Sequence, residues 1–165
     1  MKTRKLVFVF LTAALLIVLC TACGQDADTD AYEHFTEISA DAEGMISLPT
    51  EGITTEARFF NYDADGVTVQ LVALRDKDDN VHIAFNTCQS CSPSPKAYYT
   101  QADNLLQCTN CGFTFAPEQV GASSHGGCSP WPIDGVKIGE EEITLPISSL
   151  EDMRFAFETW GGPIK

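Results

Sequence analysis

The chain has 165 residues and a formal net charge of −13, with 23 acidic and ten basic side chains. All 23 acidic side chains follow Cys23, where seven basic side chains remain, so this part carries a formal charge of −16. A surface of this charge repels the phosphate groups of nucleic acids and of anionic lipids, so no nucleic acid partner is expected. Metal cations or a basic protein surface are better partners.

The first 23 residues have the pattern of an export signal. A cationic patch, residues 1–5, precedes an apolar run over residues 6–19. Fourteen helical residues rise about 21 Å, less than the roughly 30 Å hydrocarbon core, which favours a cleaved signal over a membrane span. Residues 19–24 resemble a bacterial lipoprotein box in which Cys23 becomes lipidated, although Cys20 stands where leucine is usual. An ordinary cleaved signal and an uncleaved anchor are the alternatives, and each puts the domain outside the cytoplasm.

Three regions follow from the composition: residues 1–23 as signal peptide or lipoprotein anchor, residues 24–44 as linker, and residues 45–165 as one domain. Residues 24–44 are acidic and poor in large apolar side chains, which is typical of a flexible, solvated segment. Residues 33–39 weakly favour one or two helical turns. The remaining 120 or so residues suffice for one compact core and not for two.

From residue 45 the sequence indicates a β-rich fold, mainly β to α+β, with a small antiparallel sheet. Short apolar runs alternate with turn-forming residues. The run 67–75 is apolar on one face and partly apolar on the other, which suits a central strand. Residues 81–85 are expected to pair with it and lead directly to Cys88. The predicted strands are residues 45–48, 56–62, 67–75, 81–85, 96–100, 105–107 and 142–145.

Two further elements are expected in the second half. Residues 96–100 and 105–107 predict a hairpin that brings the cysteines on either side of it to one end, as ribbon-like knuckles. Residues 148–152 predict an N-capped short helix running towards Phe157 near the C-terminus.

Five cysteines follow the linker in two Cys-x2-Cys pairs and a single residue, with sixteen residues between successive groups. Two such pairs can surround zinc or iron with a tetrahedron of thiolates. Disulfides are the usual state of exported cysteines, but an odd number and such close pairs disfavour a disulfide framework. Metal binding is the leading interpretation, and a redox-active dithiol or disulfides are the alternatives. The five are Cys88, Cys91, Cys108, Cys111 and Cys128.

The segment 126–132 surrounds Cys128 with two glycines and two prolines. Glycines let the backbone approach a bulky group, and prolines fix the turn. A zinc ribbon needs no fifth cysteine, so this segment favours an iron–sulfur cluster, with a free buried thiol as the alternative for Cys128. His125 is a further candidate ligand, whereas His82 alternates with apolar neighbours on its strand and is expected to be structural.

The sequence contains no Gly-rich phosphate loop, no Gly-x-Ser-x-Gly elbow and no carboxylate pair that stands apart from the surface charge. No catalytic residue is therefore assigned. An electron carrier or metal-binding protein is favoured over an enzyme.

The strand and cysteine runs resemble a bacterial family described as FtrD-like membrane iron–sulfur containing proteins, over about residues 46–160. The resemblance rests on residues 81–91, 106–112 and 127–132, which read VHIAFNTCQSC, LQCTNCG and GCSPWP. It implies a metal centre outside the membrane, associated with iron uptake systems that pair a permease with redox proteins. Many relatives carry several membrane helices before this domain, and an acidic residue is common where this chain has Asn86.

Three functions follow for testing. The first is a lipid-anchored iron–sulfur protein at the extracytoplasmic face of the cell membrane, which transfers electrons or handles metal with an iron permease or redox partner. The second is a structural zinc knuckle within a binding domain, and the third is a thiol–disulfide oxidoreductase. The ligands expected for the first are Cys88, Cys91, Cys108 and Cys111, with Cys128 as an alternative or additional ligand.

Overall fold

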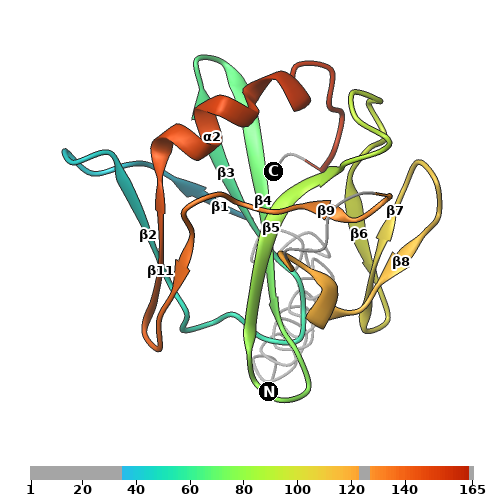
Figure 1. The fold of residues 1–165 in the computed structure, drawn as a ribbon, viewed down its shortest axis with the longest axis horizontal. Helices are drawn as coiled ribbons and strands as arrows, with labels where there is room; N and C mark the ends of the chain where they lie inside the picture. The colour runs from blue at the N-terminus through green and yellow to red at the C-terminus, as the bar shows by residue number, and fades with distance from the viewer. Residues whose placement is uncertain (1–34, 123–126, 164–165) are drawn as a thin grey trace, which may run out of the picture. The chain divides into compact units, whose positions relative to one another are not determined.

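The computed structural model describes residues 35–122 and 127–163, which lie within one compact unit, residues 31–165 (Figure 1). The predicted export signal, Cys23 and His125 fall outside the described residues. Within them the chain is β-rich, as predicted, and its strands form one five-stranded and two three-stranded sheets. No helix in this part of the chain has the length and apolar character needed to cross a membrane.

The five-stranded sheet, in the order β1-β3-β4-β5-β9, lies at the centre of the fold. β1 runs parallel to β3, and the other neighbours are antiparallel. The hairpin predicted from residues 67–75 and 81–85 is confirmed as β4 paired with β5. The strands are β1 (Phe35–Ile38), β3 (Arg58–Ala64), β4 (Val67–Arg75), β5 (Val81–Cys88) and β9 (Pro130–Trp131).

One face of this sheet is covered by a second sheet and by the C-terminal helices. The second sheet has the order β10-β11-β2, and Figure 1 shows β2 and β11 on the opposite side of the central strands from β6, β7 and β8. Its buried side chains join the central sheet and the helices in one apolar core. The elements are β2 (Met45–Pro49), β10 (Lys137–Ile138), β11 (Glu142–Pro146), α2 (Ile147–Met153) and the 3-10 helix η2 (Arg154–Ala156).

The other face is covered by the third sheet, which carries the cysteine hairpin. The predicted hairpin is confirmed as β6 paired with β7, in a register that sets Tyr99 opposite Cys108. Buried side chains of this sheet and of the central sheet form a second apolar core. The elements are β6 (Tyr99–Ala102), β7 (Leu105–Cys108), β8 (Thr114–Phe115) and the 3-10 helix η1 (Pro117–Gln119).

Covering on both faces explains why β4 is apolar at four successive positions, residues 71–74. Leu71 and Ala73 lie in the first core, whereas Val72 and Leu74 lie in the second, and none of the four is exposed. Burying a Val or Leu side chain stabilises a fold by about 1.5–3 kcal/mol. This strand therefore anchors both cores and holds β5, which leads to Cys88, in a fixed register.

Two local predictions are wrong. Phe35–Ile38 is strand β1 and not a helical turn, because it pairs with β3 and stacks the Phe35 ring on Phe59 at 5.2 Å. The C-terminal helix is present, but it has no side-chain cap, since Pro146 is the N-cap and Ser149 Oγ donates to the Asp134 carbonyl. The predicted limits of the linker and the domain stay predictions, and β1 lies inside the range assigned to the linker.

Candidate metal centre

Each Cys-x2-Cys segment forms a tight turn closed by a backbone hydrogen bond. In the first turn the N–H of Ser92 donates to the Cys88 carbonyl at 2.9 Å. In the second the N–H of Gly112 donates to the Cys108 carbonyl at 2.8 Å, and Gly112 has a φ of +76°, a conformation that favours glycine. The turns start where β5 and β7 end, so they are an equivalent pair of knuckles, as the sequence predicts.

A short strand pairing carries Cys128 to the first knuckle. β9 begins two residues after Cys128 and pairs with β5, with Pro130 opposite Cys88. The N–H of Gln89 donates to the Ser129 carbonyl at 3.2 Å, and its side-chain Nε2 lies 3.0 Å from Ser129 Oγ. The sequence does not reveal this strand, because it is two residues long, one of them a proline, and so shows no strand periodicity.

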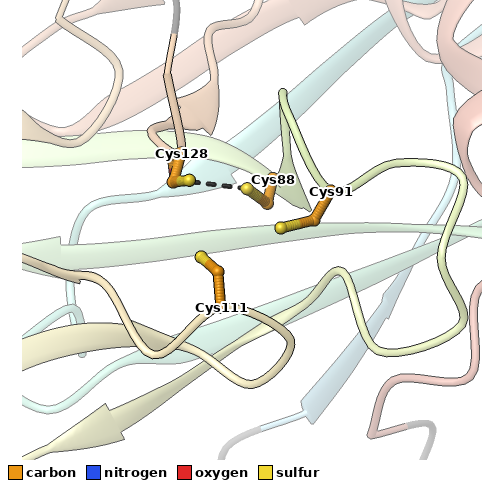
Figure 2. A group of neighbouring side chains, drawn as sticks. All are labelled: Cys88, Cys91, Cys111 and Cys128. Atoms are coloured by element: carbon orange, nitrogen blue, oxygen red, sulfur yellow. Dashed lines mark hydrogen bonds between the residues drawn. The ribbon is translucent and has the colours of Figure 1, made fainter.

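Four sulfur atoms converge at this end of the fold, and Figure 2 shows the side chains directed towards a shared space. These sulfurs all lie within 4.8 Å of one another. Cys108 is not among the four, but its sulfur lies 3.9 Å from that of Cys91. All five predicted cysteines are therefore neighbours. The convergent four are Cys88, Cys91, Cys111 and Cys128.

The thiols differ in exposure and in proton affinity. Cys111 is exposed, and although desolvation opposes it, hydrogen bonds from the Phe113 N–H and neighbouring thiols lower its pKa to about 7. The Cys128 thiol donates to Cys111, which together with desolvation raises the pKa of Cys128 to about 12. Burial raises the pKa of Cys108 to about 12 as well. Thiols lose their protons when they become metal ligands, so binding of a cation at this group would release protons.

Three residues flank the thiols in different ways. Gly127 has a φ of +74°, a conformation that favours glycine, and a Cβ there would meet no protein atom within 4 Å. Phe113 is 63% exposed. Tyr99 is fully buried, and its hydroxyl donates to the Cys128 carbonyl. No local sequence pattern marks Tyr99 as a neighbour of the cysteines. Its place depends on the pairing of β6 with β7, which sets it opposite Cys108.

His82 lies at the start of β5, whereas Cys88 ends the same strand. Its Nε2 is 2.9 Å from Oδ2 of Asp76, which gives it a structural contact. A structural role for His82 stays a prediction, and the contact with Asp76 is consistent with it.

The chain matches a known family through the region that contains these elements. Residues 53–157, which include all five cysteines, match the family described as membrane iron-sulfur containing protein FtrD-like. No curated protein and no solved structure matches the chain. Four neighbouring thiolates are a donor set that holds an iron–sulfur centre, and they also suit zinc. Since the match spans more than half of the chain, the protein belongs to the FtrD-like family of membrane iron–sulfur containing proteins.

Proposed function

We propose that this protein is an extracytoplasmic, lipid-anchored iron–sulfur protein that transfers electrons or handles metal for an iron uptake system. The observation that carries the proposal is the convergence of four cysteine sulfurs within 4.8 Å in a chain of the FtrD-like family. An iron–sulfur centre supplies one-electron transfer when bound. An iron permease or a redox protein is the proposed partner, and no substrate conversion by the chain itself is proposed.

The proposed ligands are the four convergent cysteines, with Cys108 as a neighbouring thiol. Cys88 is buried and Cys111 is exposed, so the thiol group has a protected side and an open edge. Phe113, two residues after Cys111, adds an exposed apolar side chain to that edge. Electrons or metal would therefore enter or leave the centre at the Cys111 turn. The ligand set is Cys88, Cys91, Cys111 and Cys128.

The donor geometry fits a thiolate-bound metal. Metal–sulfur bonds of about 2.3 Å give a tetrahedron whose sulfurs are about 3.8 Å apart, so sulfurs within 4.8 Å can close on one ion with small movements. A larger cluster needs the sulfurs to separate, and they belong to three different segments of the chain. Inorganic sulfide content therefore decides between one iron ion and a cluster.

The test is to extract the full chain from membranes without oxygen and to measure its visible spectrum with its iron, zinc and sulfide content. Charge-transfer bands with iron and sulfide in fixed ratio to protein support the proposal. Iron without sulfide retains an electron carrier but replaces the cluster by a single ion. One colourless zinc ion per chain favours the structural knuckle, and a metal-free chain with rapid dithiol oxidation favours a thiol–disulfide oxidoreductase.

The lipid anchor is a separate part of the proposal, supported by the lipoprotein-like residues before Cys23. Its test is metabolic labelling with a fatty acid, followed by fractionation of cells that make wild-type or Cys23→Ala protein. Label and membrane retention that depend on Cys23 support the anchor. An unlabelled chain, or equal retention of the variant, would contradict it.

A further inference from the structure

The carbonyl of Cys128 is a junction between three segments of the fold. The Tyr99 hydroxyl donates to it from β6, and the Cys88 thiol donates to it from the end of β5 at 3.3 Å. Tyr99 is completely buried, and its ring meets that of Phe115 edge-on, with centroids 5.9 Å apart. The hydroxyl is therefore held at a fixed place beside Cys88 and Cys128.

Metal loading changes only one of these two donors. Cys88 must lose its proton to become a ligand, and its donation to the carbonyl is lost with that proton. The Tyr99 hydroxyl is not a ligand, so its donation to the Cys128 carbonyl does not compete with metal binding. Of the two donors, Tyr99 is the one that can still hold the Cys128 carbonyl when metal is bound.

A row of buried amides fixes Tyr99 from the other side. The N–H of Tyr99 donates to Oδ1 of Asn86 at 2.8 Å, and Asn86 Nδ2 donates to Oε1 of Gln70 at 2.7 Å. Gln70 Nε2 in turn donates to Oδ1 of Asn61 at 2.7 Å. The three amides are at most 1% exposed, and leaving a buried polar group unpaired costs about 1–3 kcal/mol. Moving the backbone of Tyr99 would break this row.

The Cys128 segment is also attached to the first knuckle on either side of Cys128. Ser90 Oγ donates to the Gly127 carbonyl, and Gln89 binds Ser129 and the Pro130 carbonyl. Cys128 itself is held at its carbonyl by Tyr99 and Cys88. A ligand on such a segment keeps its geometry only if groups around it orient it, as partners of metal ligands commonly do.

We propose that Tyr99 is a positioning residue of the metal centre, whose hydroxyl holds the Cys128 segment against the first knuckle and so keeps the Cys128 sulfur in reach of the metal. This inference rests on the proposed metal centre. It assigns to Tyr99 no contact with the metal. Solvent exposure of a centre and hydrogen bonds to its sulfurs set its reduction potential, so a Cys128 segment that moves when the hydroxyl is lost is expected to shift the potential as well.

The test compares the full chain as wild type, Tyr99→Phe and Tyr98→Phe, each purified without oxygen. Tyr98 is the matched control, since its half-buried ring packs against Trp160 with centroids 6.0 Å apart. Three quantities are measured: the rate of iron loss to a ferrous chelator, the reduction potential, and alkylation of Cys128 by iodoacetamide in the loaded protein.

Tyr99→Phe is expected to lose iron at least tenfold faster, to change potential and to expose Cys128 to alkylation, while Tyr98→Phe matches wild type. In a Cys128→Ser background, Tyr99→Phe should have no further effect on iron loss, because its action passes through Cys128. Equal effects in both backgrounds would overturn the proposal.

Two other results separate this inference from the proposed function. Alkylation of Cys128 in loaded wild-type protein with iron retained overturns the inference, whether or not Tyr99→Phe folds. Wild-type protein that holds no metal refutes the proposed function itself. Loaded wild type with an indistinguishable Tyr99→Phe variant refutes the positioning role alone.

Discussion

The Cys88 thiol donates a hydrogen bond to the Cys128 carbonyl at 3.3 Å, although 40 positions separate the two residues. Pairing of β5 with β9 creates this contact, because it sets Pro130 opposite Cys88. The third cysteine segment therefore lies against the first knuckle, and Cys128 takes a place among the convergent sulfurs that Cys108 does not take.

Serine substitutions should separate these two cysteines. Cys128→Ser is expected to lower tightly bound metal at least tenfold, because it removes one of the four convergent sulfurs, whereas Cys108→Ser should retain the metal. Metal content and visible spectrum after dialysis against a chelator measure the effect. Cys108 is buried, so Cys108→Ser is expected to lower the unfolding free energy by about 1–3 kcal/mol and is assayed well below its Tm. Metal loss from Cys108→Ser alone would reverse the assignment.

In the metal-free protein, Cys111 should react first with iodoacetamide. It is the exposed member of the group and its pKa is lowered to about 7, so its thiolate fraction rises as the pH increases through 7. The alkylation rate should therefore be half its plateau near pH 7, while Cys108, with a pKa of about 12, stays slow. Peptide mass spectrometry over pH 5–9 measures both rates. Faster labelling of Cys108 would contradict the described burial.

Gln70→Met should destabilise the fold by at least about 2 kcal/mol. Gln70 is unexposed, donates to Asn61 and accepts from Asn86, and each buried group left unpaired costs about 1–3 kcal/mol. Urea unfolding measures the change. Gln119→Met is the control, because Gln119 is exposed and should lose less than about 1 kcal/mol. Equal losses in both variants would show that the amide row contributes nothing.

Gly121→Ala should cost more than Gly127→Ala, although both glycines have a positive φ. An alanine in this conformation costs about 1–2 kcal/mol. At Gly121 a Cβ would also stand 2.2 Å from the carbonyl oxygen of Ile83, whereas at Gly127 it would meet no atom within 4 Å. Thermal unfolding of the two variants measures the difference. A Gly127→Ala variant that is the less stable of the two would be inconsistent with this packing.

Asp76 should support the fold at neutral pH and not in acid. Hydrogen bonds from His82 and then Asn80 hold the pKa of the Asp76 carboxyl well below its usual range. The resulting stability is present above the unfolded pKa of about 3.9 and is lost as the pH falls towards the folded pKa. Asp76→Asn should therefore lower the urea midpoint at pH 7 and flatten its decline between pH 5 and 2. The exposed Asp152→Asn serves as control, and identical acid profiles for both variants would refute the role of Asp76.

The hydrophobic pattern of the sequence predicted the strands in which buried apolar residues recur along the strand. The β4 run is apolar at successive positions because both of its faces are covered, and this signal was strong enough to identify a central strand. β1 and β9 escaped prediction because each is short, and pairing with a distant partner stabilises it. The C-terminal helix was found, but its cap was not, since Ser149 satisfies a distant carbonyl instead.

The sequence by itself determined the chemistry at this end of the protein: five thiols at regular spacing, four of them in two pairs on knuckle turns that each follow a strand. Local spacing does this because a Cys-x2-Cys turn closes within a few residues. Only the tertiary structure decided which sulfurs meet, and that Tyr99 lies against Cys128. Those contacts depend on the registers of β5 with β9 and of β6 with β7. The register of two paired strands depends on segments that lie far apart in the sequence. The residues beside Cys128 show no periodic pattern that would indicate which strand they pair with.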